Sequence, residues 1–336
     1  MNNYDFLKDK IILITGGAGS FGQKFVEWIL KLSSCKKIII FSRDELKHHQ
    51  MRQKLFDYDK RLRFFLGDVR DLDRLRRAFS GVDIVVHAAA LKQVPTLEYN
   101  PFEAVKTNII GSQNVIDAAI DQKVSKVLLI STDKAAHPVN LYGSTKLCAE
   151  KLFIAGNAYS PGINRESKFS AVRYGNIIGS RGSIVETLLN NNKNSVQITH
   201  TGMTRFWINL DCAFDLVLFA LNEMEGGEIF VPKIPSMKLT DLFDVLAPNV
   251  KREIVGIRPG EKIHETLLTV EEAANSVEFD KHFIILPDFS RHWTAVKRYE
   301  KYLKKGKKIK SGFCLASDTN KDWLTKNDLK NIIRQV

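Results

Sequence analysis

The chain has 336 residues, of which 44% are hydrophobic and 26% are charged, and its formal charge is +12 at pH 7. This length allows one large hydrophobic core or two cooperating cores, and the composition excludes a disordered chain and a coiled coil. No apolar run reaches the roughly 18 to 20 residues that a membrane span needs, so the sequence predicts a cytoplasmic protein without a membrane contact.

The positive charge is concentrated near the C-terminus. Eight basic residues and one Glu lie between Lys297 and Lys310. We interpret this run as a solvated face rather than a nucleic-acid site, and the smaller excess elsewhere suits an anionic small molecule. The cysteines lie far apart without CxxC spacing, which predicts buried, reduced thiols and no metal site. They are Cys35, Cys148, Cys212 and Cys314.

Short apolar runs rich in Val and Ile alternate with amphipathic segments in the first half of the chain. Their hydrophobicity is continuous rather than alternating, which is typical of parallel strands covered by helices on both faces. We therefore expect an α/β fold, a Rossmann-like doubly wound parallel sheet, over residues 1–180. The predicted strands are Ile11–Thr15, Lys37–Phe41, Arg63–Leu66, Ile84–His87, Lys126–Ser131 and Ser170–Tyr174.

The pattern loosens beyond Gly179. Helices are predicted at Asp211–Leu221 and Leu239–Leu246, with a short strand at Glu228–Val231. We expect residues 181–336 to form mainly a smaller, interleaved α/β substrate domain. Part of 208–232 is expected to return to the first domain.

A glycine-rich turn follows the first predicted strand and precedes a predicted helix at Gln23–Leu30. Glycine allows a tight turn and a close approach to a pyrophosphate, and the helix N-terminus supplies N–H groups. This strand–turn–helix context predicts a dinucleotide site. The candidate cofactor-binding residues of the turn are Gly16, Gly19, Ser20, Phe21 and Gly22.

Further cofactor candidates follow the next three strands. An NAD-specific protein usually offers an acid after the second strand, but Arg43 stands there and can meet a 2′-phosphate, which favours NADP over NAD. The alternative for Arg43 is a weak surface pair with a neighbouring acid. Asp68 is a candidate for the adenine edge, and Ala88 and Ala89 leave room for the cofactor.

Two polar groups of residues point to proton chemistry. Tyr142 and Lys146 are four apart in a predicted helix and therefore share one face. A phenol with a pKa of about 10 is a poor base, but a neighbouring ammonium stabilises the phenolate, so Tyr142 could take a proton from a sugar hydroxyl. Thr132, Asp133 and Lys134 follow the fifth strand. Asp133 and Lys134 form either a surface ion pair or part of the same site.

The chain carries, in this order, the motifs TGGAGSFG, SRDE, GDVRD, AALKQVP, STDKA, YGSTK, RYGN, GSRGS, MTRFW and IRPGEKIHE. They resemble those of the extended short-chain dehydrogenase/reductase family and, within it, the C5-inverting UDP-N-acetylglucosamine 4,6-dehydratases of pseudaminic acid biosynthesis. The resemblance extends from about Ile11 to Leu329. It implies NADP as cofactor, UDP-N-acetylglucosamine as substrate and a homo-oligomer, either a dimer or a hexamer. Gln93 and His137 depart from the His and Asn that are often found there.

The resemblance also implies a role for each catalytic candidate. Tyr142, with Lys146 and Thr132, would promote oxidation at C4 of the sugar. Lys134 would then remove the C5 proton, and Asp133 would give a proton to the departing C6 hydroxyl before hydride returns to C6. Which of Tyr142 and Lys134 returns the C5 proton is not readable from the sequence.

Lys134 can act as a base only when its amine is neutral. Partial burial, or the proximity of Lys92 and Lys146, would lower its pKa. We therefore expect a lowered pKa at Lys134.

The UDP moiety needs cations for its diphosphate and a platform for its uracil. By resemblance, Arg205 and Arg258 are candidates for the diphosphate, because guanidinium geometry matches phosphate oxygens. Phe206 and Trp207 are either core residues or a stacking surface, and His264 is either structural or part of a network at the pocket. Further substrate-binding candidates are Lys92, which is also a cofactor candidate, Asn176, Ser183 and Glu261.

Three functions stay open at this point. The first is the inverting dehydratase. The second is a nucleotide-sugar 4-epimerase, a simple dehydrogenase, or a retaining or further-epimerising 4,6-dehydratase, although the last two types commonly carry Met in place of Tyr142. The third is a non-catalytic dinucleotide sensor that binds RNA or a protein through residues 297–310.

Overall fold

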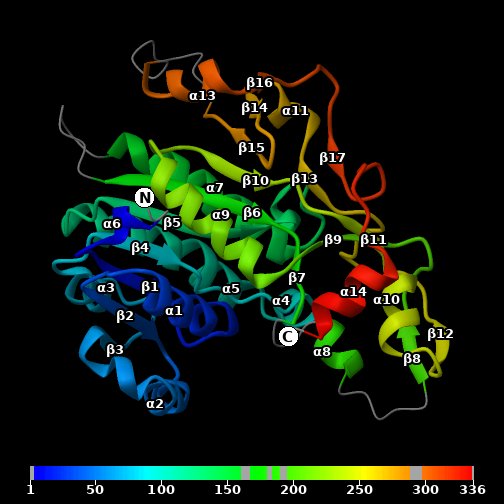
Figure 1. Ribbon diagram of the computed structural model, residues 1–336, viewed down its shortest axis with the longest axis horizontal. Coiled ribbons are helices and arrows are strands. Elements are labelled where there is room, and N and C mark those ends of the chain that lie inside the picture. Colours follow the sequence, from blue (N-terminus) through cyan, green and yellow to red (C-terminus); the bar gives the residue numbers. More distant parts are fainter. Residues whose placement is uncertain (1–3, 160–166, 180–183, 190–194, 288–296, 335–336) are drawn as a thin grey trace.

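Strands from both halves of the sequence join in one large sheet (Figure 1). In this computed structural model, which describes residues 4–159, 167–179, 184–189, 195–287 and 297–334, the sheet has ten strands in the order β16-β14-β15-β10-β6-β5-β4-β1-β2-β3. The run from β10 to β3 is parallel. Its strands are β1 (Ile11–Thr15), β2 (Lys37–Ser42), β3 (Leu62–Leu66), β4 (Ile84–His87), β5 (Lys126–Thr132), β6 (Lys168–Tyr174) and β10 (Ile229–Pro232).

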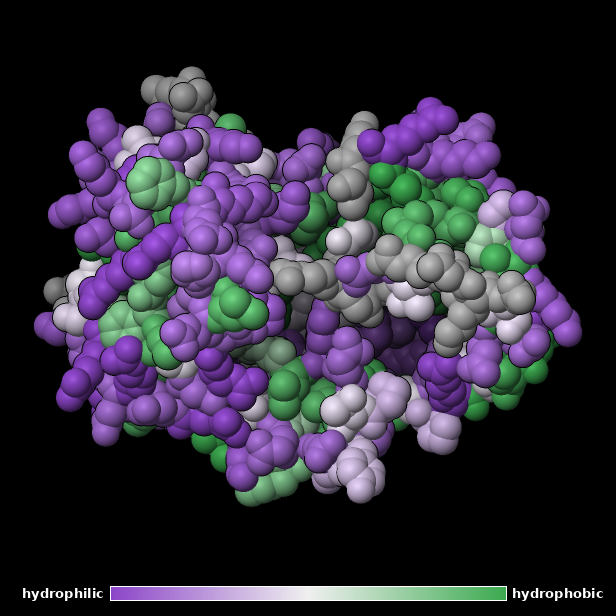
Figure 2. Space-filling view, turned by 90° about the horizontal axis from the view of Figure 1, so that it is seen from below, coloured by the Kyte–Doolittle hydropathy of each residue, from purple (hydrophilic) through white to green (hydrophobic). Residues whose placement is uncertain are grey.

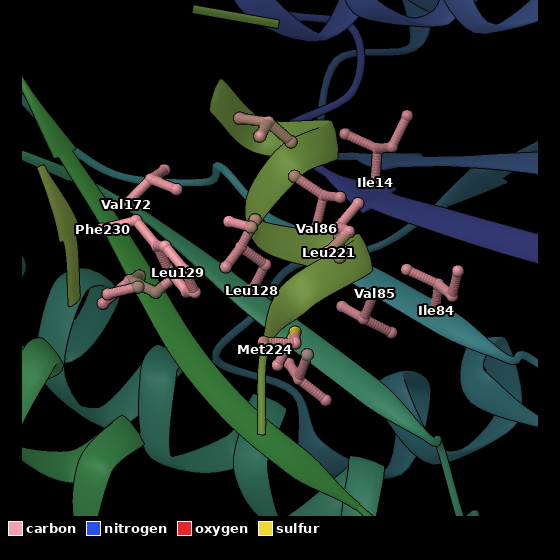
Figure 3. Packing of buried hydrophobic residues seen from close by; sticks show 14 of the residues in the cluster. Ile14, Ile84, Val85, Val86, Leu128, Leu129, Val172, Leu221, Met224 and Phe230 are labelled. Atoms are coloured by element: carbon pink, nitrogen blue, oxygen red, sulfur yellow. The ribbon is translucent and has the colours of Figure 1, made fainter. Parts of the chain in front are cut away.

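Helices cover both faces of this sheet. α9 packs on β5, β6 and β10 and contacts α1, whereas α3, α6 and α7 pack together on the opposite face. Figure 3 shows α9 crossing the strands, with Leu221 and Met224 directed at Val86 and Leu128. Among the described residues, no helix combines the length and the apolar character needed to cross a membrane. The helices of this part are α1 (Ser20–Leu32), α2 (Glu45–Lys54), α3 (Leu72–Phe79), α4 (Val94–Tyr99), α5 (Pro101–Ala104), α6 (Gly111–Asp121), α7 (Leu141–Tyr159) and α9 (Leu210–Glu223).

The predicted doubly wound fold is confirmed. Each predicted strand begins and ends within two residues of the observed one. The reason is that these runs are buried on both faces; in β4, for example, every residue is buried.

A smaller lobe beside the sheet has a core of its own. Trp207, Leu242, Phe243 and Leu329 are buried together there. The chain enters this lobe after β6, after β10 and again near its C-terminus, as Figure 1 shows. Its elements are β7 (Asn176–Ile177), α8 (Ile184–Leu189), β8 (Ser195–Ile198), β9 (Thr204–Ile208), β11 (Ser236–Lys238), α10 (Leu239–Leu246), β12 (Lys251–Ile254) and α14 (Lys326–Ile333). β13 (Thr266–Leu268) and β17 (Leu315–Ala316) pair with each other between the two parts.

The two parts are more interleaved than the predicted division implies. α9 and β10 return to the large sheet within residues 208–232. Three short strands in the part assigned to the second domain also extend the large sheet, because β15 pairs antiparallel with the edge of β10 that β6 leaves open. The strands of this extension are β14 (Ser276–Glu278), β15 (His282–Ile285) and β16 (Lys307–Lys308); α11 (Val270–Ala273) precedes them, and α13 (Glu300–Lys305) lies between β15 and β16 in the chain. Such short strands carry too weak a period to be predicted.

Most cations of the basic run are exposed, as predicted, whereas the aromatic residues between them pack against the protein. Tyr299 and Tyr302 within it are buried. The Tyr302 hydroxyl donates a hydrogen bond to Glu228, and Lys301 Nζ lies 2.8 Å from Glu225 Oε1. Part of the run therefore anchors α13 to the large sheet.

The prediction of buried thiols is wrong for most cysteines. All four are free, but only Cys35 is buried, and Cys212 is exposed. Cys212 lies in the first turn of α9, where its backbone N–H donates to the capping side chain of Asn209. That position faces away from the sheet and toward solvent.

Candidate active site

The turn between β1 and α1 makes close contacts that only glycine permits. Gly16 has a φ of +67°, and a Cβ added there would lie 2.9 Å from the Ala89 backbone. A Cβ on Gly22 would lie 2.5 Å from Gly17. The N-cap of α1 is Gly19, which has no side chain to occupy the N–H groups of the first turn. The helix therefore presents backbone donors to a ligand at this point.

A cavity of about 2100 Å³ runs from this turn to the smaller lobe. Figure 2 shows the surface hollowed between the larger body and the smaller lobe, with hydrophilic side chains in and around the hollow. Asp133 is fully buried beside this cavity, and Ser183 lies outside the described residues. The other predicted site residues line it: Gly16, Gly19, Ser20, Phe21, Gly22, Arg43, Asp68, Ala88, Ala89, Lys92, Thr132, Lys134, Tyr142, Lys146, Asn176, Arg205, Arg258 and Glu261.

At the far end of the cavity, Arg43 and Asp68 lie side by side after β2 and β3. Arg43 Nη1 lies 3.3 Å from Asp68 Oδ2, and the Arg43 side chain is half exposed at the rim. Asp44, the acid that follows Arg43, caps α2 by accepting a hydrogen bond from the backbone N–H of Lys47. Although burial opposes ionisation, hydrogen bonds from Arg70 and the charge of Arg43 hold the pKa of Asp68 below its usual range. Asp68 is therefore held in its ionised form, and its carboxylate orients the Arg43 guanidinium.

The buried carboxyl group of Asp133 directly follows the end of β5. β5 ends at Thr132, and a 3₁₀ turn, Asp133–Ala135, follows. Asp133 Oδ1 accepts hydrogen bonds from Thr132 Oγ1 at 2.9 Å and from Lys134 Nζ at 3.0 Å. Among the described residues, Oδ2 of Asp133 has no hydrogen-bond partner. Burial raises the pKa of Asp133, which favours its protonated form.

The environment of Lys134 differs from the prediction. Its Nζ atom lies 3.0 Å from Asp133, 3.4 Å from Glu265 and 3.4 Å from Asn176 Oδ1. Burial disfavours the ammonium, but the two carboxylates outweigh it and raise the pKa of Lys134 above its usual range. The expected lowering by other lysines is therefore wrong. Lys146 Nζ instead donates to the Ile130 carbonyl at 2.8 Å.

Tyr142 and Lys146 both reach the cavity from α7, as their spacing predicts. A Cβ on Gly143 would lie 2.2 Å from the Lys134 carbonyl, so glycine lets α7 approach the turn after β5. Burial raises the pKa of Tyr142 to about 12, and the charge of Lys134 opposes that rise. Burial also lowers the pKa of Lys146 to about 8, against the charge of Glu150. Lys134 is thus a cation that favours the Tyr142 phenolate, and the expected contribution of Lys146 stays a prediction.

Arg205 reaches the cavity wall from β9, but its guanidinium already has several partners. Nη1 donates to the Thr204 and Ile263 carbonyls, at 2.7 and 3.0 Å. Nη2 donates to the Lys262 carbonyl at 2.9 Å, and Nε lies 3.7 Å from Glu265 Oε1. Arg205 therefore ties β9 to the segment before β13, and its contact with a diphosphate stays a prediction.

Arg258 is exposed at the cavity, and its backbone N–H donates to Glu261 Oε2 at 3.3 Å. Phe206 is fully buried in the main core, whereas Trp207 is buried in the core of the smaller lobe and also contributes to the cavity wall. His264 Nδ1 lies 2.8 Å from Thr204 Oγ1. This contact within the protein agrees with the structural interpretation of His264.

Sequence reasoning missed Glu265. Its side chain is almost fully buried at the cavity and lies between Lys134, Arg205 and Lys262. Although burial opposes ionisation, these cations hold its pKa below the usual range. The motif IRPGEKIHE contains Glu265, so a signal existed; its spatial relation to Lys134 is not visible in the sequence.

The chain is similar to proteins of known family. A family model described as polysaccharide biosynthesis protein matches residues 12–287. The chain is 46% identical to the UDP-N-acetylglucosamine 4,6-dehydratase (inverting) of Campylobacter jejuni subsp. jejuni serotype O:23/36 (strain 81-176), over 97% of this chain and 98% of that protein. It is 43% identical to the UDP-glucose 4-epimerase of Rickettsia conorii (strain ATCC VR-613 / Malish 7), over 83% and 84% of the two chains.

Two solved structures have a similar fold. Pen from Bacillus thuringiensis matches with a TM-score of 0.88 and 36% identity, over 98% of each chain. DesIV, a dTDP-glucose 4,6-dehydratase from Streptomyces venezuelae solved with NAD and TYD bound, matches with a TM-score of 0.66 and 22% identity, over 75% of this chain and 86% of that one. The second likeness concerns the fold alone.

Proposed function

The chain belongs to the polysaccharide biosynthesis protein family, and from this premise we propose that it is a UDP-N-acetylglucosamine 4,6-dehydratase that inverts C5. The observation that carries the proposal is the pairing of Asp133 with Lys134 beside Tyr142 at one cavity, in a chain 46% identical to an enzyme of that name. A dehydrogenase needs only the tyrosine and a cofactor, whereas elimination of water also needs an acid and a base. By the family resemblance, we assign the reaction to the first step of pseudaminic acid biosynthesis.

The residues around the glycine turn fit a nicotinamide dinucleotide. A Cβ on Gly16 or Gly22 would fill space that a tight phosphate-binding turn needs, and α1 directs its first N–H groups toward the cavity. Ala88 and Ala89 contribute only small side chains to the cavity wall, which Lys92 also lines. When bound, such a cofactor supplies a hydride acceptor at C4 and a hydride donor at C6.

We assign NADP rather than NAD on the basis of Arg43. Its guanidinium is half exposed at the rim and is oriented by Asp68. Asp44, which could otherwise accept hydrogen bonds from the ribose hydroxyls, caps α2. A 2′-phosphate beside Arg43 would form a charge-assisted hydrogen bond.

The described side chains can carry the proton steps. Tyr142 in its phenolate form, which the positive charge of Lys134 favours, accepts the proton of the C4 hydroxyl and becomes a neutral phenol. A ketone at C4 makes the C5 hydrogen acidic, and the neutral amine of Lys134 removes it. Asp133 gives its proton to the C6 oxygen, which leaves as water. The C5–H and C6–O bonds break, and a C5–C6 double bond forms.

A neutral Lys134 arises within the pair itself. In the resting protein the ammonium is favoured, but its proton can pass to Asp133 along the 3.0 Å hydrogen bond. Because burial raises the pKa of Asp133, the neutral pair is accessible without a proton from solvent. That form places the base and the acid on adjacent residues.

The UDP part would extend toward the smaller lobe. Arg258 is the exposed cation at that end of the cavity and suits the diphosphate. Asn176, Glu261 and Arg205 line the same region, and we assign them to the substrate side. A homo-oligomer is part of this proposal by the family resemblance.

A 4-epimerase is the second candidate, because relatives named UDP-glucose 4-epimerase are 41 to 43% identical to the chain. Purified protein given UDP-N-acetylglucosamine separates the two. A product lighter by one water supports the dehydratase, and an isomer of unchanged mass supports the epimerase. NMR of the product formed in deuterated water then reports the configuration and the label at C5, which distinguishes inversion from retention.

A further inference from the structure

Glu265 brings a second carboxylate to the amine that the proposed mechanism uses. It comes from the segment before β13, far in sequence from the turn after β5. Its Oε1 atom lies 3.4 Å from Lys134 Nζ, opposite the 3.0 Å contact that Asp133 makes. The Glu265 side chain is only 4% exposed, yet the residue lines the cavity. The Lys134 amine therefore contacts two carboxyl groups whose pKa values are shifted in opposite directions.

The surroundings of Glu265 keep it ionised. Arg205 Nε lies 3.7 Å from Oε1, and Lys262 Nζ lies 3.7 Å from Oε2. The Glu265 backbone N–H donates to Ser317 Oγ at 2.9 Å, which fixes the chain at this point. Among the described residues, Oε2 has no hydrogen-bond partner, although it is buried. The charged and titratable groups that face this cluster are Asp133, Lys134, Tyr142, Arg205, Glu261 and Lys262.

We propose that Glu265 is a positioning residue that sets the charge of Lys134, so that Lys134 becomes a strong acceptor for the C5 proton. The division of roles follows from burial and charge. Among the described residues, Asp133 forms an ion pair with Lys134 alone and burial drives it toward its protonated form, whereas Glu265 pairs with Lys134, Arg205 and Lys262 and stays charged. When the surroundings of two carboxyl groups shift their pKa values in opposite directions, the group with the raised pKa is the acid and the other is the charge partner.

This inference rests on the proposed function. When the C5 proton moves to Lys134 Nζ and the Asp133 proton moves to the C6 oxygen, the new ammonium faces two carboxylates. An anion at 3.4 Å stabilises that ammonium and so favours the step. The same ammonium can later return its proton to the sugar, which leaves the charge of the site unchanged over the full reaction.

The first test measures the charge of Lys134 without any turnover. The holo protein is labelled briefly with acetic anhydride across a pH series, and the peptide carrying Lys134 is quantified by mass spectrometry. Only the neutral amine reacts, so the midpoint of labelling reports its pKa. Glu265→Gln is expected to lower this midpoint by about one to three pH units, because a neighbouring anion is lost. Glu271→Gln, a surface change, serves as the matched control.

The Glu265→Asp variant keeps the charge but withdraws the carboxylate. It should lower the midpoint by less than Glu265→Gln does, and it decides the question if the Gln variant does not fold. A labelling midpoint that stays at the wild-type value in the folded variants would overturn the proposal, whether or not the protein dehydrates a sugar.

The second test asks whether that charge matters in the reaction. The acid limb of kcat with UDP-N-acetylglucosamine should move to lower pH in Glu265→Gln, in the same direction as the labelling midpoint, because the loss of an anion lowers the pKa values of the coupled pair. A labelling shift with an unmoved kcat profile would overturn the role of Glu265 in C5 proton removal. If wild-type protein shows no water loss at all, the proposed function fails, and the labelling result still decides the charge of Lys134.

Discussion

Asp133 and Lys134 are neighbours in sequence but lie in different environments. The Asp133 side chain is fully buried, whereas the Lys134 side chain is 22% exposed and faces the cavity. Their hydrogen bond of 3.0 Å crosses that boundary. A proton can therefore move between a buried carboxyl group and an amine that a substrate can reach.

Replacing Lys134 with Ala removes the proposed base. Water loss from UDP-N-acetylglucosamine should fall at least about 100-fold, since a positioned general base contributes a factor of that order or more. Binding of NADP should be retained, because the glycine turn lies elsewhere in the cavity. Mass spectrometry of the product and fluorescence titration with NADPH measure the two effects. Lys251→Ala, at an exposed position on β12, is the control, and unchanged turnover in Lys134→Ala would remove Lys134 from the mechanism.

Reversing the charge of Arg43 tests the choice of cofactor. Arg43→Glu should weaken NADP binding at least about tenfold more than NAD binding, because a charge-assisted contact is replaced by repulsion of the 2′-phosphate. Dissociation constants for both dinucleotides give the ratio. Arg52→Glu, on α2 but paired with Asp59, provides the comparison. Equal losses for the two cofactors would contradict the assignment.

A buried ion cluster ties α7 and β6 to α11. The Arg173 guanidinium is fully buried and forms ion pairs with Glu150 at 2.6 Å and Glu272 at 2.8 Å. Arg173→Met should lower the free energy of unfolding by about 3 to 5 kcal/mol, because it leaves a buried carboxylate unpaired. Urea denaturation measures the change. Arg76→Met removes a surface cation paired with Asp73 and Asp121 and should have a much smaller effect; similar losses in both variants would contradict the importance of burial.

His87 should make stability depend on pH. It is buried at the end of β4, its ring is stacked on Phe153, and burial lowers its pKa to about 3. Between about pH 6.5 and 3, the unfolded chain binds a proton at His87 that the folded chain does not. Stability should therefore fall as the pH falls through this window, by about 1.4 kcal/mol per pH unit from this residue alone.

His87→Gln removes this titration, so the slope of unfolding free energy against pH between 4.5 and 6 should be smaller than in the wild type. The exposed His49 provides the control substitution, His49→Gln. Parallel slopes for His87→Gln and the wild type would show that His87 is not the group responsible.

The sequence predicted the fold through features that act locally. Strands such as Ile84–His87 are continuous apolar runs, and burial on both faces is the only arrangement that removes such a run from water. Gly16 and Gly22 stand where a Cβ would collide with the backbone, so the residue types themselves predict the turn. The spacing of Tyr142 and Lys146 likewise places both at the cavity, because a helix has a fixed period.

Charge within the site was decided by the tertiary structure alone. Whether an amine is neutral depends on which groups surround it, and Lys134 meets Glu265 only because β13 returns beside the turn after β5. Lys146, expected to act on Tyr142, donates to the carbonyl of Ile130. Electrostatic energies vary steeply with separations of a few ångströms, and those separations are set by long-range packing that no local pattern of residues encodes.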